Sequence, residues 1–313
     1  MPTEQETHLP GKTKNSNYTK AILALIAVCF FWGTTWIASR QGVKHMPALQ
    51  LASIRQTLAG LCYILFFTFR KAAWPKGKQW NTVLILSLLN FFLTNGLTTW
   101  GVKYISAGLA SIIAAIFPLW LVVIDIAWKR TRIETKALAG FLIGFSGICI
   151  IFYDHLKDLF NADFRFGIII SFIASLSWAL GTIYTKQQAN EFNPYFSIGL
   201  QMCISGIALY FTVSATGEAI PFHQIPWQSW ASIAYLITFG SVISFFAYLY
   251  ALQNLPTEQV SIYAYINPVV AVIIGSLIFS EPITIYIVIG GLITLLGVYM
   301  INQAFRKNQI NSE

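Results

Sequence analysis

Long apolar stretches separated by short polar segments run along almost the whole chain. Ten of them meet or approach the roughly 20 residues that a helix needs to cross a bilayer. They cover residues 21–39, 48–69, 80–102, 105–128, 135–152, 166–185, 195–213, 230–252, 258–279 and 283–302. Because the connections are short, neighbouring helices must be antiparallel, and no soluble catalytic domain fits between them. The pattern predicts an all-α membrane protein with ten transmembrane helices.

The second half of the chain repeats landmarks of the first half. Trp32 and Gly60 recur 146 positions later as Trp178 and Gly206. Four others recur 150 positions later: Trp80, Pro118, Gly140 and Gly147 are matched by Trp230, Pro268, Gly290 and Gly297. Five spans in each copy would place the second copy upside down, an arrangement typical of secondary transporters. We therefore expect two inverted five-helix repeats, over residues 21–152 and 166–302.

Composition agrees with a membrane setting, because 56% of the residues are hydrophobic and only 10% are charged. The net charge of +8 does not indicate nucleic acid, since the basic residues lie in short runs between apolar stretches. The expected partners are a small-molecule substrate and the lipid bilayer, with no nucleic acid, and we expect the protein to function as a monomer. Each of the four cysteines stands alone in an apolar stretch, so we expect no metal and no cofactor.

Lys and Arg are distributed unevenly between the two ends of the predicted spans. Most of the 20 lie on the side of the N-terminus. The opposite side carries Arg40, Lys44, Lys103, Lys157 and Arg165. Because cations are retained on the cytoplasmic side, we expect a multi-pass protein of the inner (plasma) membrane with both termini in the cytoplasm. Residues 1–20 and 303–313 are then cytoplasmic tails, and the polar composition of the first predicts disorder.

Aromatic residues recur in the middle of the first span of each repeat. Trp32 and Trp36 lie one helical turn apart, as do their repeat mates Trp178 and Thr182. An indole N–H needs a partner that hydrocarbon lacks, so these residues are poor candidates for lipid contact. They either pack between helices or line a central cavity.

Polar stripes at helical spacing mark the third span of each repeat. They consist of Ser87, Asn90, Thr94 and Thr98 in the first, and of Ser241, Ser244 and Tyr248 in the second. Such groups are costly in lipid unless they bond another helix or face a wet cavity. Asn90 is the strongest candidate for substrate contact, because its amide supplies two donors and an acceptor and can orient a zwitterion.

Pro118 and Pro268 lie in the middle of the fourth span of each repeat. Because proline has no backbone N–H, the carbonyl four residues earlier loses its helical hydrogen bond. These carbonyls are those of Ala114 and Ala264. Aromatic and polar residues flank the second proline: Tyr263, Tyr265 and Asn267. Irregular backbone of this kind is tolerated only inside a bundle or at a cavity. The two prolines are therefore candidate hinges, with simple kinking for packing as the alternative.

Few charged residues lie within the spans. Arg55 is about 10 Å below the outer interface, where both structural anchoring and recognition of a substrate carboxylate are open. Asp125 precedes Lys129 by one turn, which predicts an ion pair. Glu258 and Glu281 lie near the starts of the last two spans, where a helix N-terminus favours an anion. No carboxylate lies near the midplane, which argues against a buried proton relay.

Small residues mark one face of the fifth span of each repeat. Gly140, Gly144 and Gly147 lie in the first, and Gly290 and Gly297 in the second. Faces of this kind permit close approach of helix backbones and leave no space for a ligand. We expect these two spans to form a scaffold.

Several segments resemble a known transporter family. They are FFWGTTWIASR, SWALGTIYTK, GVKYISAGLASIIAAIFPLW and, most specifically, FAYLYALQNLPTEQVSIYAYINPVVAVIIGSLIFSEPITIYIVIGGLITLLGVYMI. They are similar to EamA-type members of the drug/metabolite transporter superfamily, ten-helix bacterial permeases of which many export amino acids and other small metabolites. The resemblance implies a cavity between the halves, lined mainly by spans 1, 3, 4, 6, 8 and 9. One departure is that Lys129, Arg130 and Thr131 stand where the family has a Gly-Glu pair, which Ser280 and Glu281 match in the second half.

These patterns predict a secondary transporter, either permease or exporter, that moves a small metabolite such as an amino acid by alternating access. Multidrug or cationic efflux is the alternative within transport, and a deep carboxylate would favour it. A membrane-embedded enzyme is a further alternative, but the chain has no HExxH, GxSxG or P-loop pattern. We therefore expect a protein that is not an enzyme.

Overall fold

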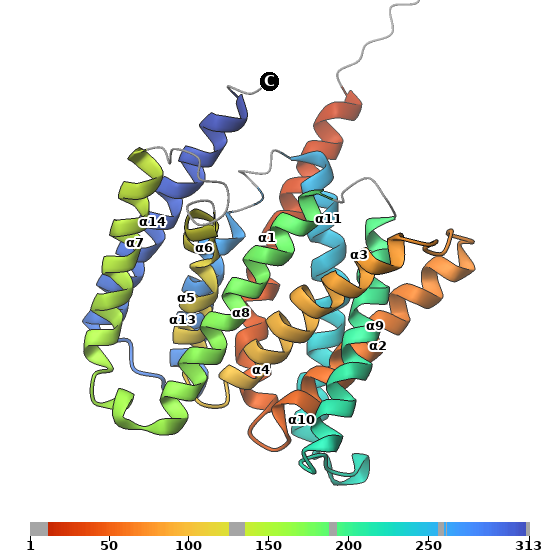
Figure 1. Cartoon of the computed structure of the whole chain (residues 1–313), viewed down its shortest axis with the longest axis horizontal. Helices are drawn as coiled ribbons and strands as arrows, with labels where there is room; N and C mark the ends of the chain where they lie inside the picture. The colour runs from red at the N-terminus through yellow and green to blue at the C-terminus, as the bar shows by residue number, and fades with distance from the viewer. Residues whose placement is uncertain (1–11, 125–134, 188–192, 256–259, 261, 311–313) are drawn as a thin grey trace, which may run out of the picture.

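The computed structural model describes residues 12–124, 135–187, 193–255, 260 and 262–310, and Figure 1 shows their arrangement. All regular secondary structure in these ranges is helical. Asp125, Lys129 and Glu258, about which the sequence led to expectations, lie outside the described residues.

Six helical spans of the described residues are long and apolar enough to cross a membrane. They are α1 (Lys12–Gly42), α2 (Ala48–Phe69), α3–η1–α4 (Gln79–Leu86, Ser87–Gly96, Leu97–Gly101), α8 (Ala162–Gln187), α9 (Pro194–Ala215) and α10–η5–α11 (Trp227–Tyr235, Leu236–Ile243, Ser244–Asn254). Four apolar stretches are shorter and lie in α5–α6 (Ala107–Ala115, Phe117–Ile124), α7 (Thr135–Asp154), α13 (Tyr263–Phe279) and α14 (Ile285–Ile310). Short 3₁₀ helices, η3 (Asp158–Phe160) and η4 (Phe222–Gln224), lie in connections.

The first and last helices extend beyond the predicted spans. α1 begins at Lys12, so residues 12–20, expected in a disordered tail, continue the helix. α14 likewise runs on to Ile310. Lys, Gln and Arg in these extensions are good helix formers, which lets a helix nucleated in the apolar span continue into the polar segment.

In its described residues each repeat has one π-helical segment, and the two lie at matching positions. η1 spans Ser87–Gly96 in the first repeat, and η5 spans Leu236–Ile243 in the second. The wider turn frees backbone groups that side chains then bond. Asn95 Nδ2 donates to the Asn90 carbonyl at 2.9 Å, and the Ser244 hydroxyl donates to the Phe239 carbonyl. Segments of this type occur frequently at functional sites.

Two closely packed helix pairs flank the structure, α7 with α14 at one end and α2 with α9 at the other (Figure 1). Glycine makes both contacts close. A Cβ at Gly297 would lie 2.3 Å from the backbone nitrogen of Gly144, and one at Gly60 would lie 2.5 Å from that of Cys203. The predicted packing of the glycine faces of the fifth spans is confirmed. The other helices lie between these pairs.

Many large apolar side chains of the described helices are exposed on the outside. Leu277, Phe211 and Leu292 are 79%, 68% and 64% exposed, respectively. Exposure of this extent is unusual for a protein in water but is expected for a surface that faces lipid.

Two adjacent glycines of α14 allow a test of the helix contact. A Cβ at Gly290 would lie 2.7 Å from the Gly147 carbonyl oxygen, whereas one at Gly291 would meet only Ile112 Cδ1, at 3.9 Å. We expect Gly290→Ala to destabilise the protein by about 1–3 kcal/mol, because backbone must move to accept the methyl group. Gly291→Ala is the matched control and should be neutral or slightly stabilising. Thermal unfolding of the purified protein in detergent measures both, and equal effects would contradict the contact.

Candidate functional site

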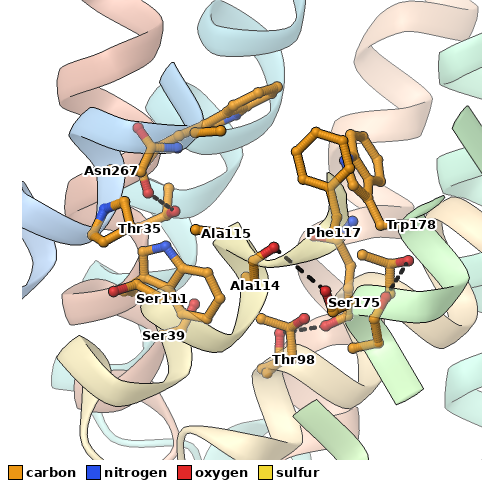
Figure 2. A pocket seen from close by; sticks show the side chains of 18 of the residues that line it. Thr35, Ser39, Thr98, Ser111, Ala114, Ala115, Phe117, Ser175, Trp178 and Asn267 are labelled. Carbon is orange, nitrogen blue, oxygen red and sulfur yellow. Dashed lines mark hydrogen bonds between the residues drawn. The ribbon is translucent and has the colours of Figure 1, made fainter. Parts of the chain in front are cut away.

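A cavity of about 160 Å³ lies among helices of both repeats (Figure 2). The first repeat contributes Trp32, Thr35, Trp36, Ser39, Arg55, Thr94, Asn95, Thr98, Thr99, Ser111, Ala114, Ala115 and Phe117. The second repeat contributes Ala174, Ser175, Trp178, Phe245, Tyr263, Ala264, Asn267 and Pro268. Figure 2 shows Phe117 and Trp178 on one side of the cavity and Thr35, Ser39 and Ser111 on the other. The lining residues come from α1, α2, η1, α4, α5, α6, α8, α11 and α13.

Aromatic side chains form one wall of this cavity. The Trp32 ring contacts those of Phe245 and Tyr263, with centroids 5.2 and 5.0 Å apart. Trp32 Nε1 donates to the Gly240 carbonyl at 3.2 Å, so this indole N–H has the partner inside the bundle that the sequence required of it. The wall is held in place from both repeats.

Hydroxyl groups line much of the remaining surface and donate to nearby carbonyl groups. Thr35, Thr99 and Ser111 donate to the carbonyls of Trp32, Asn95 and Gly108, at 2.6, 2.7 and 2.6 Å. Thr94 Oγ1 bonds both the Leu89 carbonyl, at 2.7 Å, and the Ala174 carbonyl, at 3.2 Å. A hydroxyl that donates its hydrogen in this way keeps lone pairs that can accept from a ligand.

The helix of the fourth span is broken beside the cavity. α5 ends at Ala115, Ile116 is not helical, and α6 starts at Phe117. The carbonyl of Ala114 accepts a hydrogen bond from Ser175 Oγ at 3.5 Å, as Figure 2 shows. In the second repeat α13 continues through Pro268 without a break. The two matching prolines therefore have different local structures.

Among the described residues of the lining, Arg55 is the one with a charged side chain, and it is only 7% exposed. Its Nε donates to Ser241 Oγ of η5 at 3.0 Å. The guanidinium lies against Gly240, where a Cβ would come within 3.3 Å of Nη2. Within the described residues Arg55 has no acidic partner, and the lining contains no Asp or Glu. The charge of the cavity wall is therefore positive.

Seven of the predicted site residues line the cavity: Trp32, Trp36, Arg55, Thr94, Trp178, Asn267 and Pro268. The other six lie outside its lining: Asn90, Pro118, Thr182, Ser244, Tyr248 and Tyr265. Tyr248 stands behind the wall, with its ring 5.2 Å from that of Trp32, and Tyr265 faces Tyr299 at 6.4 Å. Thr182 bonds the carbonyl of Trp178 at 2.8 Å.

The predicted polar stripe lines the cavity only in its second half. Thr94 and Thr98 line it, together with their neighbours Asn95 and Thr99, whereas Ser87 and Asn90 do not. Asn90 packs against Gly181 of α8, where a Cβ would lie 1.9 Å from Asn90 Oδ1. Its amide therefore faces a neighbouring helix and lies outside the cavity lining.

Five hydroxyl residues of the lining were missed by the stripe argument: Thr35, Ser39, Thr99, Ser111 and Ser175. Each stands in a mainly apolar run, so no periodic signal separates it from a serine or threonine that bonds its own helix. No group of three or more His, Cys, Asp or Glu that could hold a metal ion occurs in the part of the chain that the structure describes.

A second polar cluster joins the repeats where α1 ends. Arg40 Nε lies 2.8 Å from Glu281 Oε1, and Arg40 also donates to the carbonyls of Val102, at 3.1 Å, and Ile105. Glu281 accepts from the backbone N–H of Ala107 at 3.1 Å. Glu281 thus caps α5 of the first repeat, whereas the sequence suggested the start of its own helix. An anion at the N-terminus of α5 is stabilised by the free N–H groups there.

The sequence matches the EamA-like transporter family twice, over residues 19–153 and 165–303. The protein named Uncharacterized transporter YvbV of Bacillus subtilis (strain 168) is 24% identical over 290 residues, covering 91% of this chain and 92% of that protein. Uncharacterized inner membrane transporter YedA of Escherichia coli (strain K12) is 28% identical over 266 residues, 83% of each chain.

A crystal structure of a protein that is 14% identical matches with a TM-score of 0.63 over 91% of this chain and 97% of that one, which shows a shared fold. The two matches to the family model cover most of the chain, one in each half. Together with the apolar helices described above, they make this a multi-pass membrane protein. The chain belongs to the EamA-like transporter family.

Proposed function

We propose that this protein is a secondary transporter of the inner (plasma) membrane that moves a small metabolite, such as an amino acid, by alternating access through the cavity between its repeats. The observation that carries the proposal is the lining of that cavity, which comes from both halves of the chain. A site between two repeats is reached from opposite sides when the repeats rock against each other.

The proposal includes ten transmembrane helices arranged as two inverted repeats, over residues 21–152 and 166–302, with both termini in the cytoplasm. The four shorter apolar stretches supply the spans beyond the six long ones. The excess of Lys and Arg at the end of the bundle that holds the termini supports this orientation. We further propose that the protein acts as a monomer.

The size and charge of the cavity favour a small metabolite over a drug. Its volume of about 160 Å³ is small for a ligand site. Pockets for drug-sized ligands hold about 300–1,000 Å³. A cationic drug would also need an acid, and among the described lining residues Arg55 alone is charged. The family and the cavity favour a transporter that is not an enzyme.

The cluster around Arg40 and Glu281 supports the alternating-access part of the proposal. It connects the end of α1 and the start of α5 with the segment between α13 and α14. We propose that the cavity opens toward this end when the two repeats separate here and the ion pair breaks. The break at Ile116, two residues before Pro118, makes Pro118 the first proposed hinge, and Pro268 in the continuous α13 is the second candidate.

Fusions test the orientation. We expect a fluorescent protein fused to either terminus to fluoresce in the cytoplasm, because the cations on that side are retained there. Alkaline phosphatase inserted between α7 and α8 should be active outside. Termini on opposite sides of the membrane would mean an odd number of crossings and would exclude the inverted-repeat arrangement.

Cysteine labelling tests the cavity as a water-filled path. After replacement of the four native cysteines, Ser111→Cys and Ser175→Cys should react with a small water-soluble thiol reagent, because both positions line the cavity. Ser205→Cys is the matched control, since Ser205 is equally buried but lies outside the lining. Equal labelling at all three positions, measured by mass shift, would contradict the assignment.

Removal of the Glu281 charge tests whether the ion pair between Arg40 and Glu281 limits access to the cavity from this end. Glu281→Gln keeps the shape of the side chain but loses the ion pair with Arg40. We expect labelling of Ser111→Cys by a membrane-impermeant reagent in intact cells to rise several-fold, because the repeats separate more readily at this end. Glu218→Gln removes an exposed acid from another connection and should leave the rate unchanged. An unchanged rate in Glu281→Gln would show that the cluster does not control access.

A further inference from the structure

The free charge of Arg55 is the feature of the cavity that its surroundings do not explain. The side chain is buried, and its single hydrogen bond to a described residue uses Nε, the atom farthest from the end of the guanidinium. Of the five donors of an arginine, four therefore remain for a ligand. A buried cation without a counter-ion is strongly unfavourable in a membrane.

The described acids do not supply a counter-ion. Glu281 is engaged with Arg40 and the start of α5. Asp158 pairs with His155 in a connection between helices, and Asp163 and Glu218 are exposed at helix ends or in turns. Arg40 shows what a satisfied arginine looks like in this protein, with a carboxylate and two carbonyl groups around it. Among the described residues Arg55 is bonded to neither kind of group, and its hydrogen bond goes to the Ser241 hydroxyl.

We propose that Arg55 binds the carboxylate of the transported molecule, which is an amino acid or a similarly small amino-carboxylate. This inference rests on the proposed function, since it names the substrate class of the same cavity. The bond from Nε to Ser241 and the contact with Gly240 fix the plane of the guanidinium. Its outer edge then presents two parallel N–H groups, the geometry that a carboxylate accepts.

The rest of the lining suits the other end of such a molecule. The hydroxyls of Thr35, Thr99 and Ser111 already donate to carbonyl groups, so toward the cavity they offer lone pairs. The Ala114 carbonyl beside the helix break has only a long bond of 3.5 Å from Ser175. These acceptors fit the N–H groups of an ammonium. The aromatic wall around Trp32 then contacts the apolar side chain.

Binding of matched probes to the purified protein tests this assignment. L-Threonine, L-leucine and L-phenylalanine, which differ in size, are compared with their carboxamides by thermal shift and by titration calorimetry. We expect at least one amino acid to stabilise the protein and its carboxamide to fail, because the amide lacks the charge that Arg55 needs. In Arg55→Met the affinity for that amino acid should fall by roughly 10- to 100-fold, the loss expected for a charge-assisted hydrogen bond.

The stability of the ligand-free protein separates a binding role from a structural one. If Arg55 binds substrate, Arg55→Met removes an unpaired buried charge, and the unfolding temperature without ligand should stay the same or rise. Arg55→Lys keeps the charge but not the fork and should bind with intermediate affinity. Arg165→Met, which removes an exposed cation in the first turn of α8, controls for net charge and should bind normally.

Three results would overturn the inference. A large loss of ligand-free stability in Arg55→Met would make the residue a structural anchor. Equal stabilisation by amino acids and by their carboxamides would mean that the cavity does not recognise a carboxylate. Stabilisation by sodium chloride alone to the same extent would assign Arg55 to an inorganic anion. In the last two cases the labelling of Ser111→Cys and Ser175→Cys still tests the transport path separately. Failure of the carboxylate assignment can therefore be distinguished from failure of the proposed function.

Discussion

No water is available inside a bilayer to satisfy an unpaired N–H or C=O, and this constraint decides where the helices of this protein can be irregular. Within its described apolar spans the main departures from α-helix are η1, η5 and the break between α5 and α6. All three adjoin residues that line the cavity, and side chains bond the groups they free, as Thr94 does for Leu89 and Ser175 for Ala114. Irregular backbone and polar side chains are thus gathered at one place, and the lipid-facing surface stays regular and apolar.

The glycine contacts at the two ends of the structure complement this arrangement. α7 with α14 and α2 with α9 approach so closely that a single methyl group would collide with backbone. Such contacts leave no room for a ligand and little for movement, because packed backbone cannot deform gradually. The remaining helices hold the cavity between these frames. A transporter needs both properties, a rigid support and a centre whose contacts can be exchanged.

Two arginines show how the same side chain serves different purposes. Arg40, at the end of α1, is neutralised by Glu281 and by carbonyl groups, and it ties the two repeats together. Arg55 is more deeply buried, and its one hydrogen bond to a described residue runs from Nε to Ser241 of the opposite repeat. The described residues provide no carboxylate for Arg55, and this difference from Arg40 is the basis of the proposal that Arg55 binds the substrate.

The sequence by itself determined the membrane setting, the helical class and the duplication, because span length, apolar composition and the recurrence of Trp32 as Trp178 are independent of packing. It also pointed to Trp32, Trp178, Arg55 and Asn267 as unusual residues for lipid contact, and all four line the cavity. The tertiary structure decided the rest. Asn95 lines the cavity and Asn90 does not, because Asn90 packs against Gly181 of α8, a contact that helical periodicity cannot indicate. Glu281 caps α5, a helix 174 residues away in the sequence, rather than its own. The roles of Ser111 and Ser175 depend on which helices surround them, because the sequence around an isolated serine in an apolar run does not indicate which residues lie near it in space.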